Sequence, residues 1–514
     1  MPIRISQRLL GKLLVTIFFL NIFEYLQAGM IAFSANPIMG EIGASPEEFG
    51  LVSAVYACIA VIMIAQQHWL VERIGWRRYI QIGLAFSVLG AVVCYFSHSF
   101  TSFLAGRAIM ALGGASFMTS ARLLTLLLPP GLIRFAGIKV FVVSMTLGMA
   151  GAPFLASLAV SHDSWNSVFL LLIGCAAIAW LFASFCLPTH VVPKEARLTQ
   201  SNPVLLLLLL LGGFTFFYVF RRSSYNFYSN ALVLLAMLVV AIVCLALFVR
   251  RLHRHDEKSL LRIRPVLQDR LFLVSTLFSC AFFIMNAASN YILPMLLQKG
   301  FNFAWTPIGQ YMSIGLSMSL LAWIVFSKTV VKSPTLKKYL IPGGLCVVFY
   351  GWRLASLTPQ ASLPLHILPA LMANGLFLIL VMSPITALGF RSMQQDEVLF
   401  SHAMQLRNMI AQLALSLGIA FGTVFMQWRT TVHFSDLGAS FRPGRWPFDQ
   451  TWTALSEVLG RSLNDGSASL AALSQLQQML LQQATIMAAL DYFYGVMVFG
   501  AVVTVIFWWQ KLVK

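Results

Sequence analysis

Long apolar runs are the feature that most restricts what this chain can fold into. A helix needs about 20 mostly apolar residues to cross the hydrocarbon core of a membrane, which is about 30 Å thick. Fourteen segments are long and apolar enough. They cover residues 13–33, 49–69, 79–97, 102–126, 137–160, 165–187, 203–220, 231–249, 271–297, 305–327, 339–357, 364–388, 402–427 and 487–509. The sequence therefore predicts an all-α integral membrane protein with 14 transmembrane helices.

The composition excludes other broad classes. The 514 residues are 59% hydrophobic and 10% charged, whereas a soluble globular protein is about 45–50% apolar and about 25% charged. A water-soluble enzyme, a disordered protein and a nucleic-acid-binding domain are thereby excluded. No metal-binding cluster, nucleophile–base pair or phosphate-binding loop stands out in the sequence. We therefore expect neither an enzyme nor a bound metal or cofactor.

The net charge of +18 is best explained by membrane orientation. Cytoplasmic loops of membrane proteins are enriched in Lys and Arg, and here the basic residues gather in alternate loops. They lie in the two terminal tails, around 73–78, 134–139, 194–197, 250–270 and 328–338, and at Arg391. The pair Arg221–Arg222 is an exception. The first run, 13–33, is too long for a signal peptide and lacks a small-x-small cleavage site, so it is predicted to be retained. We expect a bacterial inner-membrane protein with both termini cytoplasmic.

The order of the apolar runs predicts two six-helix bundles with two additional helices between them. The expected units are an N-terminal bundle over 1–190, the two additional helices over 200–250, a basic cytoplasmic linker over 251–270 and a C-terminal bundle over 271–514. A long periplasmic loop, 428–484, interrupts the last unit. Leucines at helical spacing in 470–483 predict an amphipathic lid or an extension of the final helix. The alternative is a docking surface for a periplasmic membrane-fusion adaptor.

The loop between the second and third runs carries a motif. Its sequence, His68-Trp-Leu-Val-Glu-Arg-Ile-Gly-Trp-Arg-Arg78, resembles the G-x-L-a-D-r-x-G-r-k motif of the major facilitator superfamily. Glu72, Arg73, Gly75 and Arg77 stand at the matching positions, with Glu in place of Asp. The basic residues can pair with the acid and with carbonyls at a helix C-terminus, so we expect this loop to hold one conformation.

A second motif lies in the run 137–160. Gly148-Met-Ala-Gly-Ala-Pro-Phe-Leu-Ala-Ser157 resembles the antiporter motif G-x-x-x-G-P-x-x-G-G, with small residues retained at each glycine position. Small residues let helices pack closely, and Pro153 removes one backbone hydrogen bond. In the family, this motif occurs in exporters. The resemblance implies a role in conformational gating for Gly148, Ala152 and Pro153.

Other segments resemble the EmrB/QacA-type branch of 14-helix drug:proton antiporters. They are Leu127-Leu-Pro-Pro-Gly-Leu-Ile-Arg134, Leu296-Leu-Gln298 and the start of the last apolar run, 482–493. The first-helix motif of that branch is largely absent, and Ala28 stands where Asp is expected. This chain is thus identified as a divergent member. The resemblance implies alternating access between the two bundles, driven by the proton gradient.

Glu24 is the one acid that lies clearly in the middle of an apolar run. An ionisable group at this depth costs roughly 2.5 kcal/mol or more and usually faces a protein interior or a water-filled pathway. Low polarity favours the protonated form of a carboxyl group. We therefore predict that Glu24 carries the coupling proton or binds a cationic substrate.

Three arginines also lie within predicted helices: Arg107, Arg122 and Arg407. Arg107 resembles the arginine of a fourth-helix motif that the superfamily links to proton transfer, and it could pair with Glu24. Arg407 is expected to extend to the membrane interface as a snorkelling side chain. Substrate-binding candidates, chosen by position in the runs, are Tyr25, Gln27, Asn286, Asn290, Tyr291 and Asn374.

These features predict a proton-coupled antiporter that exports amphipathic small molecules or drugs. The alternative is a dedicated exporter of a metabolite such as a siderophore. The divergent first helix keeps that alternative open. A panel of toxic dyes and antibiotics would separate the two.

Overall fold

The computed structural model describes residues 7–114, 116–126, 128–129, 131–162, 164–187, 202–254, 261, 263–330, 335–393, 396–461 and 465–510. Within these ranges the chain is helical and contains no strand. The all-α prediction is confirmed. The predicted basic loop at 194–197, residues 255–260 and 262 of the basic linker, and residues 511–514 of the C-terminal tail lie outside the described residues.

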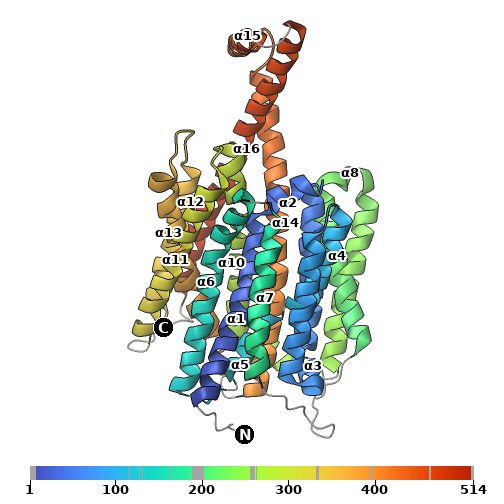
Figure 1. Cartoon of the computed structure of the whole chain (residues 1–514), viewed down its shortest axis with the longest axis vertical. Coiled ribbons are helices and arrows are strands. Elements are labelled where there is room, and N and C mark those ends of the chain that lie inside the picture. Colours follow the sequence, from blue (N-terminus) through green and yellow to red (C-terminus); the bar gives the residue numbers. More distant parts are fainter. Residues whose placement is uncertain are drawn as a thin grey trace.

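The helices follow one another through the described part of the chain (Figure 1). The α-helices are α1 Gln7–Phe33, α2 Ala35–Glu41, α3 Pro46–Tyr95, α4 Phe100–Gly114, α5 Phe117–Leu126, α6 Leu132–His162, α7 Ser167–Cys186, α8 Pro203–Arg254, α9 Ile263–Gln268, α10 Arg270–Met295, α11 Trp305–Thr329, α12 Lys337–Ala355, α13 Leu368–Gly389, α14 Glu397–Ser440, α15 Trp446–Gly460 and α16 Asp465–Trp509. Short π-helical segments η2 Leu296–Gly300 and η3 Leu363–Ile367 and the 3₁₀ segment η4 Arg391–Met393 connect some of them.

Twelve described segments are long and apolar enough to cross a membrane. Two differences separate this number from the predicted 14. The predicted spans 49–69 and 79–97 both lie in α3, which leaves helical geometry at Gly75 with φ +78°. The predicted span 339–357 coincides with α12, which is not among the twelve. The count of 14 transmembrane helices stays a prediction.

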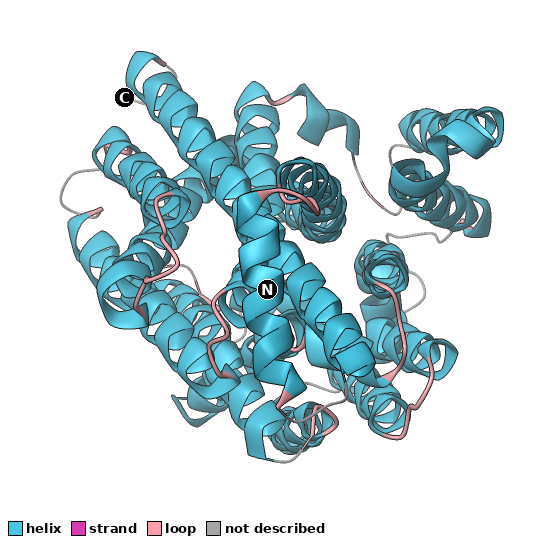
Figure 2. Ribbon diagram, turned by 90° about the horizontal axis from the view of Figure 1, so that it is seen from above, coloured by secondary structure: helices cyan, strands magenta, loops and turns pink. Residues whose placement is uncertain are grey.

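The helices pack in two groups that touch each other at specific pairs. In the first part of the chain, α1 packs against α6 and α7, and α3 packs against α4. In the second part, α10 packs against α14, α11 against α13, and α12 against α16. The groups meet where α6 contacts α11 and where α14 contacts α3 and α5. Figure 2 shows this bundle nearly along its helix axes.

Helix α8 lies at one side of the bundle (Figure 1) and presents an apolar surface. Leu232 is 84% exposed, and Val239, Val240 and Ile242 are also exposed. This surface is typical of a helix that faces hydrocarbon.

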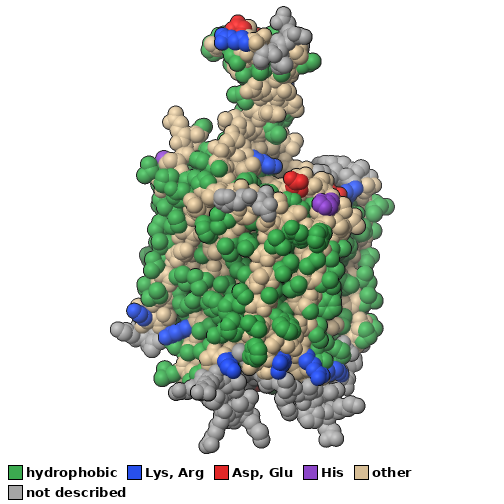
Figure 3. All heavy atoms as spheres, in the orientation of Figure 1, with side chains coloured by type: hydrophobic (Ala, Val, Ile, Leu, Met, Phe, Trp, Pro, Cys, Tyr) green, Lys and Arg blue, Asp and Glu red, His purple; other side chains and the backbone are tan. Residues whose placement is uncertain are grey.

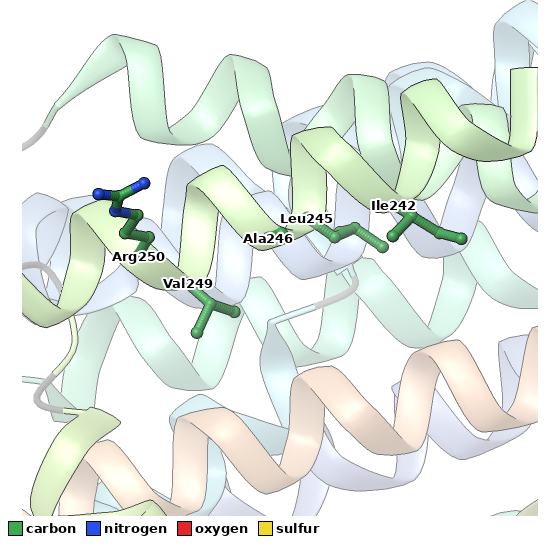
Figure 4. Close-up of a pocket in the computed structure, with 5 residues that line it drawn as sticks. All are labelled: Ile242, Leu245, Ala246, Val249 and Arg250. Carbon is green, nitrogen blue, oxygen red and sulfur yellow. The ribbon is translucent and has the colours of Figure 1, made fainter.

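A pocket on the second half of α8 is lined by Ile242, Leu245, Ala246, Val249 and Arg250 (Figure 4). Four of these are aliphatic, so the pocket offers no carboxyl group to carry a proton.

Glycines bring α3 and α4 into backbone contact. A Cβ atom on Gly113 would lie 1.9 Å from the carbonyl oxygen of Gly83, and a Cβ on Gly90 would lie 2.6 Å from the carbonyl oxygen of Gly106. The two glycines of each helix are seven residues apart, so they lie on one face. Small residues at such contacts allow close helix packing in membranes. These glycine contacts with α3 fix the position of the C-terminal end of α4.

Helices α14 and α16 extend beyond the bundle as a stalk, with α15 at its tip (Figure 1). The predicted extension of the final helix is confirmed, because α16 begins at Asp465. Arg429 Nη2 and His433 Nε2 of α14 each lie 2.6 Å from Asp491 Oδ2 of α16. These contacts tie the two helices together at the base of the stalk.

The basic residues visible in Figure 3 gather mainly around the end of the apolar body opposite the stalk. The N-terminus lies at the same end (Figure 1). This distribution agrees with the enrichment of Lys and Arg on one side of a membrane. Cytoplasmic placement of both termini stays a prediction.

Candidate functional site

Glu24 lies at the meeting point of three helices. Its side chain is 5% exposed. One carboxyl oxygen, Oε2, accepts a hydrogen bond from the backbone N–H of Met118 in α5. The other, Oε1, accepts a hydrogen bond from Gln412 Nε2 of α14 at 3.2 Å. Glu24 therefore joins α1 to α5 and also to a helix of the second group.

The backbone N–H of Met118 is free to donate to Glu24 because the helix is interrupted between α4 and α5. Helix α4 ends at Gly114 and α5 begins at Phe117, so Met118 is in the first turn of a new helix. The first four N–H groups of a helix have no acceptor within it, and the helix N-terminus stabilises negative charge. Discontinuous helices of this kind form binding sites in transporters. The break gives the Glu24 carboxyl a donor that a continuous helix could not provide.

One face of α14 carries three amide side chains that reach the first group of helices. Gln405 Nε2 donates to the carbonyl oxygen of Ile64 at 3.4 Å, and Asn408 Nδ2 donates to Thr119 Oγ1 at 2.9 Å. Gln412 donates to Glu24. The spacing of three and four residues places these amides on one helix face. The two groups of helices are thus joined here by individual polar contacts.

Substitution Gln412→Leu should lower the rate of transport about tenfold, because a hydrogen bond to a charged group contributes about 1.5–3 kcal/mol. The measurement is the initial rate of substrate transport across the membrane at matched expression. Gln427→Leu is the control, since Gln427 is an exposed residue of the same helix. Equal rates for both variants would contradict a role of Gln412 in the site.

Arg107 lies apart from Glu24, and the expected ion pair between them is not formed among the described residues. Its guanidinium carbon lies 4.4 Å from the ring centroid of Tyr56. A cation over an aromatic face is attracted by the ring quadrupole, which replaces the expected carboxylate. The Tyr56 hydroxyl accepts a hydrogen bond from Gln27 Nε2. Arg107 thus reaches α1 through Tyr56 and Gln27, one helical turn from Glu24.

Three of the other candidates, on α1 and α10, have defined surroundings. The Tyr25 hydroxyl donates to Met118 Sδ at 3.1 Å, beside the Glu24 contact. On α10, Asn286 Oδ1 is buried without a hydrogen-bond partner in the described part of the chain. Tyr291 is buried, with its ring near Gly422 of α14.

The candidates of the second group do not join the Glu24 site. Asn290 is half-buried on α10, and Asn374 is buried on α13. No contact of Asn286, Asn290, Tyr291 or Asn374 with Glu24 is recorded among the described residues. Tyr25 and Gln27 are therefore the two candidates that lie beside it, and substrate binding by all six stays a prediction.

The first motif forms contacts within α3 and toward α14. Glu72 Oε1 lies 3.4 Å from His68 Nε2, and the Arg73 guanidinium lies 4.0 Å from the Trp69 ring centroid. The His68 ring meets the His402 ring of α14 edge to face at 5.9 Å. Gly75 has a positive φ, which glycine adopts readily, and Arg77 follows this bend. The motif thus lies beside the contact between α3 and α14.

The second motif packs α6 against two other helices. A Cβ on Gly148 would lie 2.8 Å from Tyr25 Cβ, and a Cβ on Gly29 would lie 2.5 Å from Ala152 Cβ. On α11, a Cβ on Gly309 would lie 2.5 Å from the carbonyl oxygen of Pro153. The motif therefore permits close packing on α1 and also on α11 of the second group. Its role in gating stays a prediction.

The prediction that Arg407 extends to the membrane interface is wrong. Its side chain is 4% exposed and lies inside the bundle. Nη2 donates to Ser279 Oγ at 2.6 Å and to Thr386 Oγ1 at 2.8 Å. These hydroxyl groups on α10 and α13 hold the guanidinium inside the bundle, so it does not snorkel.

Comparison with known proteins establishes the family. A family model described as Major Facilitator Superfamily matches residues 17–423. The chain belongs to the major facilitator superfamily. This confirms the resemblance noted in the sequence and makes the protein a transporter rather than an enzyme. It also agrees with the observed packing of two helix groups.

The superfamily relatives with similar sequences are distant. The chain is 25% identical over 404 residues to the uncharacterized MFS-type transporter YhcA of Bacillus subtilis (strain 168). This match covers 78% of this chain and 73% of YhcA. The chain is 23% identical over 272 residues to the putative multidrug resistance protein MdtD of Escherichia coli O6:H1, covering 53% of this chain and 56% of MdtD. The match to MdtD thus spans about half of each protein.

Solved structures share the fold of this chain. One is a bacterial homolog of the human lysosomal transporter Spinster in an inward-facing and unoccupied conformation. It has a TM-score of 0.58 at 14% identity, covering 98% of this chain and all of that one. Another comes from a study of substrate recognition in proton dependent oligopeptide transporters. It has a TM-score of 0.57 at 12% identity, with 96% and 97% coverage. At these identities the likeness shows the fold alone.

Three parts of the site were not singled out from the sequence: Gln412, Tyr56 and the N–H of Met118. Gln412 and Tyr56 are polar side chains within apolar runs, which is a signal that the sequence contains. The donor from Met118 is a backbone group, and its signal is the Gly113–Gly114 pair before the helix break.

Proposed function

We propose that this superfamily member is a proton-coupled antiporter that exports amphipathic small molecules by alternating access. The observation that carries the proposal is the position of Glu24, a buried carboxyl group that bridges α1, the N-terminus of α5 and α14. An antiporter requires a group whose protonation alters the contact between its two moving halves. Glu24 meets this requirement through its bond with Gln412.

Protonation of Glu24 changes the number of hydrogen bonds that it can accept. An ionised carboxylate accepts on both oxygens, whereas a protonated carboxyl has one O–H donor and less acceptor capacity. Met118 N–H and Gln412 Nε2 are both donors, so a proton on the carboxyl group competes with one of them. The contact with α14 is a single side-chain bond at 3.2 Å. Proton binding thus weakens the link between the two groups of helices.

Arg107 takes a supporting part in this proposal. It is buried, and the chain of contacts from Arg107 through Tyr56 to Gln27 ends one turn from Glu24. A change of conformation that brings this positive charge closer to the carboxyl would lower the free energy of its ionised form. Arg107 therefore helps the site release its proton after the protein changes conformation.

Two further observations support export. The second motif packs α6 against both α1 and α11, so it lies where the two groups of helices must move against each other. The relative MdtD is described as a putative multidrug resistance protein. The proposed driving force is inward proton flow, and the proposed location is a bacterial inner membrane with cytoplasmic termini.

Transport in liposomes tests this function. Purified protein is reconstituted, a pH gradient is imposed, and the movement of two dyes is followed, the cation ethidium and the anion 8-anilinonaphthalene-1-sulfonate. The proposal expects at least one dye to be driven against its concentration gradient and to stop when an ionophore collapses the pH gradient. Dye movement that is unaffected by the ionophore would overturn proton coupling.

A further inference from the structure

Two arginines face each other across the contact between the two groups of helices, and the function proposed above does not use them. Arg122 belongs to α5 of the first group, and Arg407 belongs to α14 of the second. Their guanidinium carbons lie 5.7 and 5.4 Å from the ring centroid of the same residue, Phe390. Both guanidinium groups thus lie against one aromatic ring, where their like charges repel each other.

These charges lack an anionic partner. Arg407 is bound by two neutral hydroxyl groups, and its Nη1 is buried with no hydrogen-bond partner in the ranges that the structure describes. The Arg122 guanidinium lies over the rings of Phe141 and Phe390, 5.5 and 5.7 Å from their centroids. No ion pair with Asp or Glu is recorded for either arginine among the described residues.

Such an arrangement is costly unless an anion completes it. Arg407 is buried and Arg122 is half-buried. A buried charge is normally paired, and a like charge nearby adds repulsion to the cost of desolvation. The nearest recorded contacts of both guanidinium groups are neutral rings and hydroxyl groups. Guanidinium groups bind carboxylate, phosphate and sulfonate groups through paired hydrogen bonds. The excess of positive charge disfavours a cationic ligand.

We infer that the transported substrate is an amphipathic anion whose charged group binds between Arg122 and Arg407. This inference rests on the proposed function, and it names the substrate class. Because the two arginines belong to different groups of helices, a bound anion neutralises their repulsion and draws α5 and α14 together. Phe390 and Phe141 beside them provide an aromatic surface for the apolar part of the molecule.

Equilibrium binding tests the inference without a proton gradient. Full-length protein in discs of phosphatidylcholine is titrated with 1-naphthaleneacetate and with 1-naphthylmethylammonium, which share one aromatic ring system and carry opposite charges. The anion should bind more tightly than the cation. Arg407→Gln and Arg122→Gln should each weaken anion binding about tenfold or more, and Arg407→Lys should restore part of it.

Arg391→Gln is the matched control, because Arg391 is exposed and adjacent to Phe390. It should bind the anion as the unchanged protein does. The lysine variant and Arg122→Gln keep the test decisive if Arg407→Gln fails to fold. Tighter binding of the cation, or equal anion binding in both glutamine variants and the control, would overturn the inference.

A lipid headgroup is a second source of the same chemistry. Adding phosphatidylglycerol to the discs should leave naphthaleneacetate binding unchanged, whereas competition by this lipid would overturn the assignment to a transported substrate. Binding and gradient-driven transport are measured separately. If the unchanged protein drives a dye against its gradient but does not bind naphthaleneacetate, the inference alone is refuted. If the unchanged protein binds naphthaleneacetate but shows no proton-driven transport, the proposed function alone is refuted.

Discussion

Replacing Glu24 by Gln should abolish proton-driven accumulation of substrate while leaving passive exchange in place. Gln has nearly the same shape and cannot be ionised, so it resembles the protonated carboxyl at all pH values. Its carbonyl oxygen can accept from Met118 N–H or from Gln412, the two donors that Glu24 binds. Coupling free energies between two sites are typically 1–3 kcal/mol, which corresponds to about 5- to 150-fold in affinity. We therefore expect accumulation against a gradient to fall by about 5- to 150-fold, down to the level that passive exchange alone gives.

The measurement compares two modes of transport in the same liposomes. Accumulation driven by a pH gradient reports coupling, and exchange of labelled for unlabelled substrate without a gradient reports the conformational cycle. Glu457→Gln is the matched control, because it makes the same chemical change at an exposed position of α15. Full accumulation by Glu24→Gln would show that another group carries the proton.

The second large effect is expected at Gly113. In the variant Gly113→Ala, the new methyl carbon would lie 1.9 Å from the Gly83 carbonyl oxygen and 2.8 Å from Ser87 Oγ. The nearest of these atoms is backbone, so α3 and α4 must separate to make room. Overpacking of this kind costs about 1–3 kcal/mol, and occasionally more. A shift of α4 also moves the helix break that presents Met118 N–H to Glu24, so transport should fall together with stability.

Thermal unfolding of the purified variant, followed by loss of the monodisperse peak in size-exclusion chromatography, measures the effect. Gly174→Ala provides the comparison, because no atom lies within 4 Å of a Cβ at that exposed position of α7. Alanine has a higher helix propensity than glycine by about 1 kcal/mol. The control should therefore be as stable as the unchanged protein, or slightly more stable. Equal melting of the two variants would contradict the close contact between α3 and α4.

The positions of the helices could be predicted from the sequence because hydrophobic length is a strong local signal. The runs 165–187 and 271–297 match α7 and α10 within a few residues. Gly75 shows where this signal ends. The helix continues on both sides of a bend there, and hydropathy does not reveal that two predicted spans belong to one helical element. The family was also evident from motifs, and the family model confirms it.

The partners of the candidate residues could not be predicted in the same way. Burial of Glu24 followed from its place in an apolar run, but its bonds to Met118 and Gln412 depend on contacts across 94 and 388 residues. The pairing expected for Arg107 failed because Tyr56 occupies the face of the guanidinium. The hydroxyl groups that hold Arg407 inside the bundle lie on other helices. They could not be identified from the residues around Arg407, and the sequence therefore predicted an interface position. Local sequence does not encode which faces of distant helices meet.

Proton movement coupled to substrate movement is the most direct test of the role of Glu24. Liposomes loaded with a pH-sensitive dye and containing the purified protein receive a pulse of transported substrate. We expect a change of internal pH with the unchanged protein and with Glu457→Gln, and none with Glu24→Gln at equal protein content. The same pH change with Glu24→Gln would contradict the claim that this carboxyl group carries the coupling proton.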